Sequence, residues 1–195
     1  FLLAFKKSEN SLPVILNLFR QGNKLLGFWF GDLLTETIKH VFSHIGISKI
    51  NILKKYLKEE QLSYKSKNVV AQGMLCIGFK YPDTKQPEIV EAYHEVFSYF
   101  LTHKENEKLI ETDLISQMVR NCFYLDSAPL ANIIQALYAC NLVEPNIVGD
   151  RKTVLERIKK TTYKRSNPTP FFEDIYELYE NMCDNWLEED INEEG

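Results

Sequence analysis

The sequence predicts a mostly helical fold with a small amount of strand (α+β), arranged as two winged-helix domains in tandem. Two observations predict this fold. Apolar residues recur at three- and four-residue spacing over several segments, which is the period of an amphipathic helix. In addition, residues 127–146 (SAPLANIIQALYACNLVEPN) indicate a helix that runs into a short strand. That order is typical of a winged helix, where the third helix leads into a β-wing.

Residues 1–31 are expected to form a helical and apolar lead-in to the first domain. Pro13 stands where a helix start tolerates a missing N–H, so a short helix is predicted over residues 12–19. Residues 25–30 (LLGFWF) are unusually apolar. Both a buried strand and a docking surface fit this run, and core packing is the simpler interpretation.

The first winged helix is expected over residues 32–111. Asp32 and Ser48 are placed to begin helices, and Gly46 to end one. Helices are therefore predicted over 32–45, 48–57 and from Pro87 to residue 101, a polar loop over 62–68, and short strands over 74–81 and 108–110. The run at 74–81 (MLCIGFKY) is short and apolar with an internal glycine, which is consistent with a strand but ambiguous.

The second winged helix is expected over residues 112–195. A helix begins at Thr112, and a second one begins at Ser127 with Pro129 in its first turn. Asn141 is a suitable left-handed stop for that helix, and a strand follows at Leu142-Val143. A short basic helix around 154–158, a polar loop over 161–170 and an acidic closing helix over 171–187 complete the domain.

Composition restricts the class of protein. The chain has 195 residues, of which 45 % are hydrophobic and 26 % charged, so it is globular. No apolar run approaches the roughly 20 residues of a membrane span. The opening FLLAFKK is not a secretory signal and carries no initial Met, so we expect a longer parent chain. Cys76, Cys122, Cys140 and Cys183 form no C-x-x-C pair, and we expect free thiols in a reducing compartment.

Charge is distributed unevenly along the chain. The net charge is −4, yet from Phe171 onward there is no Lys or Arg. The acidic residues there are Glu173, Asp174, Glu177, Glu180, Asp184, Glu188, Glu189, Asp190, Glu193 and Glu194. The preceding residues are therefore basic overall. A solvated helix face accounts for the acidic stretch, and so does contact with a basic partner.

Catalytic motifs are not recognised in this sequence. None of the glycines falls in a G-x-x-x-x-G-K or G-x-G-x-x-G order, which phosphate and dinucleotide sites use. His40 and His44 have the spacing of a metal pair on a helix, but no third ligand is apparent. We therefore expect no cofactor, no metal and no enzymatic activity, and interpret the chain as a binding module.

A basic cluster is the candidate nucleic-acid site. Its residues are Arg151, Lys152, Lys159, Lys160, Tyr163, Lys164 and Arg165, and Arg157 lies among them. The cations could hold phosphates and Tyr163 could stack on a base. The alternative is a solvated helix and loop whose charge is balanced by the acidic stretch that follows. A second group (Lys54, Lys55, Lys58, Lys65, Lys67) is diluted by Glu59 and Glu60.

Three stretches carry a family resemblance. They are residues 33–62 (LLTETIKHVFSHIGISKINILKKYLKEEQL), residues 87–110 (PEIVEAYHEVFSYFLTHKENEKLI) and residues 114–143. Their order is similar to the C-terminal half of the STN subunit of the CST telomere complex, which is built as two winged helices. The composition, rich in Lys, Asn and aromatic residues, is consistent with a ciliate telomerase-associated relative.

The resemblance implies a non-catalytic protein-interaction module at chromosome ends in the nucleus. Its implied partners are a TEN-like small subunit and a large CST-like subunit, reached through the full-length chain, and telomerase or polymerase alpha–primase. The implied mechanism is tethering, with at most weak contact to single-stranded DNA. The acidic closing helix and the residues before 32 have no match in that family.

Two other functions fit the same pattern of helices. One is a DNA-binding winged helix of a transcription or replication factor, whose third helix would enter the major groove. The predicted helix at 127–140 contains no Arg or Lys, which argues against groove reading. The other is a helical scaffold such as a subunit of the proteasome-lid type.

Overall fold

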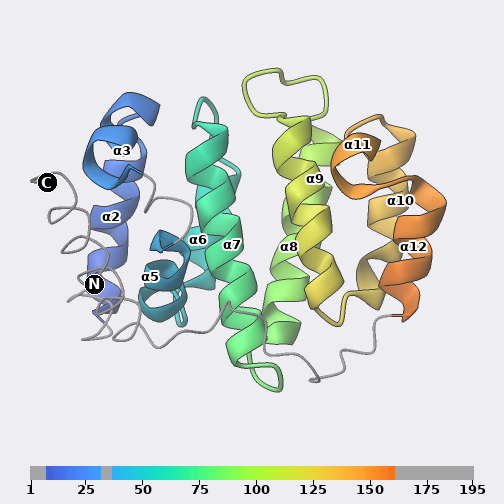
Figure 1. Ribbon diagram of the computed structural model, residues 1–195, viewed down its shortest axis with the longest axis horizontal. Coiled ribbons are helices and arrows are strands. Elements are labelled where there is room, and N and C mark those ends of the chain that lie inside the picture. The colour runs from blue at the N-terminus through green and yellow to red at the C-terminus, as the bar shows by residue number, and fades with distance from the viewer. Residues whose placement is uncertain (1–7, 32–36, 161–195) are drawn as a thin grey trace, which may run out of the picture.

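The computed structural model describes residues 8–31 and 37–160, and every regular element in these two ranges is a helix (Figure 1). In chain order the elements are η1 (Glu9–Ser11), α2 (Leu12–Phe19), α3 (Asn23–Phe30), α5 (Ile38–Ile45), α6 (Ile50–Leu57), α7 (Tyr64–Lys80), α8 (Gln86–Thr102), α9 (Thr112–Asn121), η2 (Cys122–Tyr124), η3 (Ala128–Leu130), α10 (Ala131–Ala139), α11 (Pro145–Val148) and α12 (Arg151–Lys160).

The helices stand side by side in chain order along the long axis of the molecule, from α2 at one end to α12 at the other (Figure 1). Contacts connect alternate helices. In one row α5 packs on α7 and α7 on α9, and in the other α6 packs on α8 and α8 on α10. α12 then packs on α10. This stacking resembles that of an α-solenoid, in which each unit buries its apolar face only against its neighbours.

Helix α7 is the centre of the core. It contacts α5, α6, α8 and α9, and its residues are buried almost without interruption from Ser66 to Gly78. Two glycines permit close approach of the neighbouring helices. A Cβ at Gly73 would lie 2.6 Å from the Cβ of Phe42, and one at Gly78 would lie 3.0 Å from Leu125. The apolar residues around α7 belong to one continuous core that runs from Leu12 to Ile158.

The predicted tandem winged-helix fold is wrong, because the described residues contain no strand and so no β-wing. Residues 74–81, expected as a strand, belong almost entirely to α7, which begins at Tyr64 inside the expected loop. The side chain of Ser63 caps this helix by accepting a hydrogen bond from the N–H of Ser66. Because α7 is buried on all sides, its sequence lacks the helical alternation that would have distinguished it from a strand.

The expected strand at Leu142-Val143 is a helix-capping turn. Asn141 adopts a positive φ of 55° and its N–H bonds to the carbonyl of Tyr138. The N–H of Leu142 bonds to the carbonyl of Leu137, which completes a Schellman motif. Leu142 and Val143 are buried in this turn, and α11 follows. Two apolar residues directly after a helix predict a strand, but here they are buried in the turn that caps the helix. Residues 108–110 likewise form a turn, with Leu109 in the core.

Several helix predictions are confirmed. Pro13 stands in the first turn of α2, and Pro87 in that of α8. Gly46 ends α5, and Asn141 follows α10 in the left-handed conformation. The apolar run 25–30 forms no strand but belongs to α3, where Phe28 is 79 % exposed. The expected helix start at Asp32 and the closing helix at 171–187 lie outside the described residues.

The telomeric implications of the family resemblance depended on the winged-helix pattern. That structural basis is wrong, while the implied partners and nuclear localisation stay predictions. The division of the chain near residue 111 also stays a prediction.

Candidate functional site

Helix α12 carries the described part of the predicted basic cluster, and its start is fixed by Asp150. The Asp150 carboxylate accepts hydrogen bonds from the N–H groups of Lys152 (2.9 Å) and Thr153 (3.1 Å), and from the Thr153 hydroxyl (2.6 Å). Hydrogen bonds from the Thr153 side chain and backbone hold the pKa of Asp150 below its usual value. This carboxylate occupies the position at the helix start where an anion would otherwise bind.

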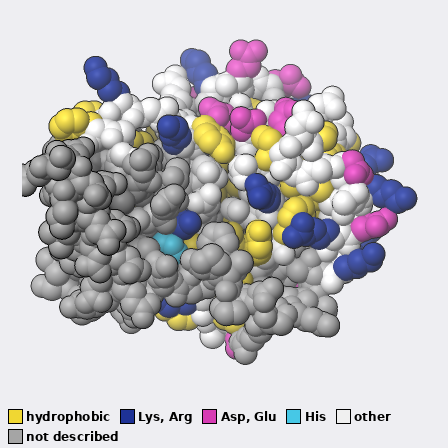
Figure 2. All heavy atoms as spheres, in the orientation of Figure 1, with side chains coloured by type: hydrophobic (Ala, Val, Ile, Leu, Met, Phe, Trp, Pro, Cys, Tyr) yellow, Lys and Arg dark blue, Asp and Glu magenta, His cyan; other side chains and the backbone are white. Residues whose placement is uncertain are grey.

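Packing of α12 forces its cations outward. Val154 and Ile158, four residues apart, are 1 % and 0 % exposed and face the core. The side chains of Arg151, Lys152, Arg157, Lys159 and Lys160 are all exposed. Figure 2 shows Lys and Arg side chains gathered over this end of the molecule, with acidic side chains among them. The helix therefore presents five cations and one carboxylate, Glu156, to its surroundings.

Four of these cations have no counter-ion in the described part of the chain. Arg151, Lys152, Lys159 and Lys160 form no ion pair or side-chain hydrogen bond with residues 8–31 or 37–160. The predicted balancing partner, the acidic stretch, lies outside the described residues. The described surface of α12 is therefore electropositive, which favours binding of anionic groups.

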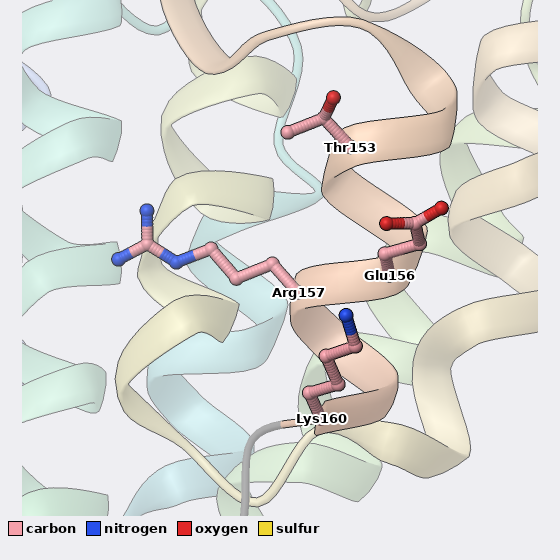
Figure 3. A pocket seen from close by; sticks show the side chains of 4 residues that line it. All are labelled: Thr153, Glu156, Arg157 and Lys160. Atoms are coloured by element: carbon pink, nitrogen blue, oxygen red, sulfur yellow. The ribbon is translucent and has the colours of Figure 1, made fainter.

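Arg157 differs from the other four. Its guanidinium carbon lies 4.1 Å from the centroid of the Phe123 ring, at cation–π distance. Phe123 belongs to η2, so this contact ties α12 to the segment that follows α9. In Figure 3, Arg157 extends from the helix on the side away from Glu156. We therefore assign Arg157 chiefly to the orientation of α12.

Two shallow hollows flank Glu156. The first, of about 410 Å³, is lined by Thr153, Glu156, Arg157 and Lys160 (Figure 3). The second, of about 300 Å³, is lined by Gln135, Arg151, Lys152, Leu155, Glu156 and Lys159. We call this second hollow the basic groove. Its lining consists of three cations, one amide, one apolar side chain and one carboxylate, so cations outnumber anions. This lining suits a carboxylate-bearing ligand, because Lys and Arg donate to carboxylates while Leu155 offers apolar contact.

The structure brings together Arg151, Lys152, Lys159 and Lys160 of the predicted site on one helix. Tyr163, Lys164 and Arg165 lie outside the described residues. Sequence reasoning missed Gln135, which reaches the basic groove from α10, and the stacking of Arg157 on Phe123. Neither contact could be predicted from neighbouring residues in the sequence, because Gln135 and Phe123 are far from α12 along the chain.

The second lysine group is not brought together. Lys54 and Lys58 both pair with Glu95, at 2.7 and 3.8 Å, and Lys58 also lies over the Tyr99 ring. Lys67 is 1 % exposed. Lys54 and Lys58 therefore form ion pairs with α8, and Lys67 is buried in α7. These three lysines do not form one binding surface.

The two helix histidines, His40 and His44, lie on α5. His40 is buried at 6 % exposure, and burial together with nearby cations lowers its pKa to about 4. Residues 8–31 and 37–160 contain no group of three or more His, Cys, Asp or Glu side chains that could hold a metal.

The described cysteines are free thiols. Burial raises the pKa of Cys76 to about 11 and shifts that of Cys122 upward as well, so neither thiol forms a reactive thiolate near neutral pH. Cys183 lies outside the described residues. None of the helices in the described ranges is long and apolar enough to cross a membrane.

Comparison with known proteins gives one match. A family model described as a protein of unknown function (DUF1186) matches residues 1–189. No curated protein and no solved structure matches the chain. Because the family model covers nearly the whole sequence, this chain belongs to the DUF1186 family.

Proposed function

We propose that this protein is a helical docking module that binds an acidic segment of a protein partner through the basic groove of α12. One observation carries the proposal. Arg151, Lys152 and Lys159 are exposed around a hollow and have no counter-ion among the described residues. The sequence also predicts a binding module, and the telomeric setting stays a prediction of the family resemblance.

The surroundings of the groove favour a peptide over a nucleic-acid backbone. Glu156 lines both hollows, and the exposed Asp150 carboxylate lies at the start of the helix. A continuous phosphate backbone would bring charges close to these carboxylates, which repel it. An acidic peptide has separated carboxylates that can pair with the cations on either side of Glu156. A helix of ten residues is also only about 15 Å long, which is short for a nucleic-acid track.

The helical array supports such a role physically. α12 is held by the burial of Val154 and Ile158 and by the stacking of Arg157, so the groove is presented on a rigid face. A rigid platform binds with less loss of conformational entropy than a flexible loop. The function would be to hold an acidic protein partner close to other molecules that this chain binds.

The test is a binding titration with the full chain. The probe is a fluorescent decapeptide of alternating Glu and Asp, followed by anisotropy at several salt concentrations. Substitution of Arg151, Lys152 and Lys159 by Gln should weaken binding by roughly tenfold, because each exposed charge pair contributes about 0.2–1 kcal/mol. The matched control replaces the exposed Lys55, Lys65 and Lys108 by Gln and should leave the affinity unchanged.

Two results would contradict the proposal. One is equal loss of affinity in the α12 variant and in its matched control, which would indicate a nonspecific charge effect. The other is tighter binding of a labelled single-stranded oligonucleotide than of the peptide, with a steeper salt dependence. That result would reassign the groove to nucleic-acid binding.

A further inference from the structure

We propose that Glu156 determines the specificity of the basic groove, and that the partner is a helix carrying an acidic, a basic and a second acidic side chain in that order. This inference rests on the proposed function, because it names the partner of the same groove. It gives a role to the single carboxylate of α12, which a site for acidic groups alone has no need to contain.

The sign of the charge alternates along one exposed face of α12. Lys152, Glu156 and Lys159 are separated by four and three residues, so they form one stripe on the helix surface. All three side chains are exposed, and all three line the basic groove. The stripe therefore presents a positive, a negative and a second positive charge over roughly 10 Å of the helix axis.

Glu156 is not neutralised by the described part of the chain. Its carboxylate forms no ion pair or hydrogen bond with residues 8–31 or 37–160, although Lys152 precedes it by one turn. A lysine that precedes a glutamate by four residues is the less favourable order for an ion pair along a helix. Among the described residues, Glu156 is therefore available to a cation that a partner brings.

A helix lying along α12 has charges in the matching register. Two neighbouring helices rise equally per residue, so side chains at i, i+3 and i+7 of an antiparallel partner meet Lys159, Glu156 and Lys152. In a parallel partner the positions are i, i+4 and i+7. An extended peptide instead places side chains of one face about 7 or 14 Å apart, which fits the roughly 10 Å between the two lysines less well. Glu, Lys and Glu at the helical positions would pair with all three groups.

The wall of the groove that α10 contributes is uncharged. α10 contains no charged residue, and its exposed positions Asn132, Gln135 and Ala139 recur at intervals of three and four. Gln135 lines the groove together with the half-buried Leu155. A helix resting on α10 and α12 would therefore need a small or apolar face beside its charged stripe. This combination describes an amphipathic helix.

The experiment measures the binding of two labelled helical peptides to the full chain by fluorescence anisotropy. Both are alanine-based, about 20 residues long and identical in composition and net charge. The motif peptide contains the order Glu, Lys, Glu once at i, i+3, i+7 and once at i, i+4, i+7. The isomer has the same positions in the order Glu, Glu, Lys. Circular dichroism first establishes that the two peptides are equally helical.

The natural chain should bind the motif peptide roughly tenfold more tightly than the isomer, because the isomer places a carboxylate against Glu156 and an amine against a cation. Glu156→Gln should reduce this preference and Glu156→Lys should abolish it. A third peptide, with Glu in place of each Lys, should bind Glu156→Lys more tightly than it binds the natural chain. The control Glu107→Lys makes the same charge change at an exposed position after α8 and should keep the preference.

The outcomes separate this inference from the proposed function. The groove variant Arg151→Gln, Lys152→Gln, Lys159→Gln should bind both peptides more weakly. If it does, but the natural chain binds the two peptides equally, the inference is overturned while docking stands. If the groove variant loses no affinity for either peptide, the proposed function is overturned as well. A preference that Glu156→Lys leaves intact, or that Glu107→Lys removes to the same extent, also overturns the inference.

Discussion

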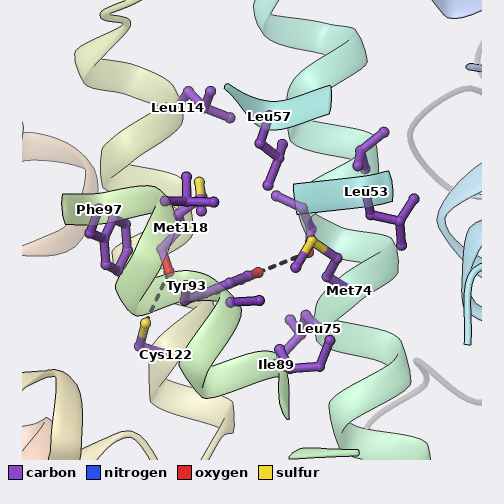
Figure 4. Packing of buried hydrophobic residues seen from close by; sticks show 14 of the residues in the cluster. Leu53, Leu57, Met74, Leu75, Ile89, Tyr93, Phe97, Leu114, Met118 and Cys122 are labelled. Atoms are coloured by element: carbon purple, nitrogen blue, oxygen red, sulfur yellow. Dashed lines mark hydrogen bonds between the residues drawn. The ribbon is translucent and has the colours of Figure 1, made fainter. Parts of the chain in front are cut away.

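The Tyr93 hydroxyl donates a hydrogen bond to the carbonyl oxygen of Ala71 at 2.8 Å, and both residues lie in the core (Figure 4). The same hydroxyl accepts a bond from the Asn121 side-chain amide at 3.2 Å. Tyr93 is on α8, Ala71 on α7 and Asn121 on α9, so one phenol joins three helices. Burial raises the pKa of Tyr93 strongly, so the phenol stays neutral and remains a donor.

Replacement of Tyr93 by Phe should destabilise the fold by about 1–3 kcal/mol, because it leaves the buried Asn121 amide without its acceptor. Urea unfolding followed by circular dichroism measures this change. The control is Tyr81→Phe, since the half-buried Tyr81 forms no side-chain hydrogen bond with any described residue. Equal stabilities for the two variants would show that the three-helix junction contributes nothing.

Replacement of Gly73 by Ala should also destabilise the protein, by roughly 1–2 kcal/mol. The added Cβ would lie 2.6 Å from the Cβ of Phe42 and 3.2 Å from the carbonyl oxygen of Lys39, so α5 and α7 must separate. The matched control is Gly27→Ala in α3, where the new Cβ meets nothing within 4 Å. That variant should gain about 0.5–1 kcal/mol from helix propensity. Thermal melts of both variants test the close approach of the two helices, and a stabilised Gly73→Ala protein would contradict it.

Replacement of the buried Lys67 by Met should stabilise the protein. The Lys67 side chain is 1 % exposed, and burial lowers its pKa to about 8 against the effect of Glu111, Glu59 and Glu60. At pH 7 the charged amine therefore costs free energy, and Lys67→Met should raise the free energy of unfolding by about 1–3 kcal/mol. Lys65→Met, at an exposed neighbouring position, should change stability by less than about 0.5 kcal/mol.

The pH dependence of Lys67 gives a second check. The unfolded chain binds more protons than the folded chain between pH 8 and the ordinary lysine pKa of 10.5, so natural stability rises over this window relative to the Met variant. The advantage of Lys67→Met should therefore shrink as pH rises. An advantage that stays constant from pH 7 to 10.5 would show that Lys67 is solvated.

His40 should make the fold sensitive to mild acid. Burial, and then the nearby Lys39, His44 and Lys80, lower its pKa to about 4 from 6.5. Between these two pH values the unfolded chain takes up a proton that the folded chain does not, so stability falls as pH falls from 6.5 to 4. The loss attributable to His40 is about 1–3 kcal/mol. Denaturation across this range should show a shallower pH slope for His40→Gln and an unchanged slope for His94→Gln, at an exposed position.

The helices could be predicted where one face is buried and the ends carry strong signals. Pro13 at a start, Gly46 at an end and Asn141 at a left-handed stop all act through local backbone chemistry, which the sequence contains. The fold class could not be predicted from these signals. α7 is buried on every side, so its apolar run at 74–81 carries no period that separates helix from strand.

The candidate site was predicted in part for a similar reason. The cations of α12 are close together in the sequence, so the sequence alone reveals them as a cluster. Gln135 and Phe123, in contrast, reach α12 through tertiary packing alone. The proposed selection of acidic peptide over nucleic acid depends on Glu156 and Asp150. Both are adjacent to the cations in the sequence, but the capping bonds of Asp150 and the place of Glu156 in both hollows are seen only in the folded helix.

If the charge of the basic groove selects the partner, reversing that charge should reverse the preference. The protein would carry Arg151→Glu, Lys152→Glu and Lys159→Glu. Anisotropy titrations would use the acidic decapeptide and a Lys decapeptide of equal length. The swap should abolish binding of the acidic peptide and create binding of the basic one. Undiminished binding of the acidic peptide by the swapped protein would contradict this expectation.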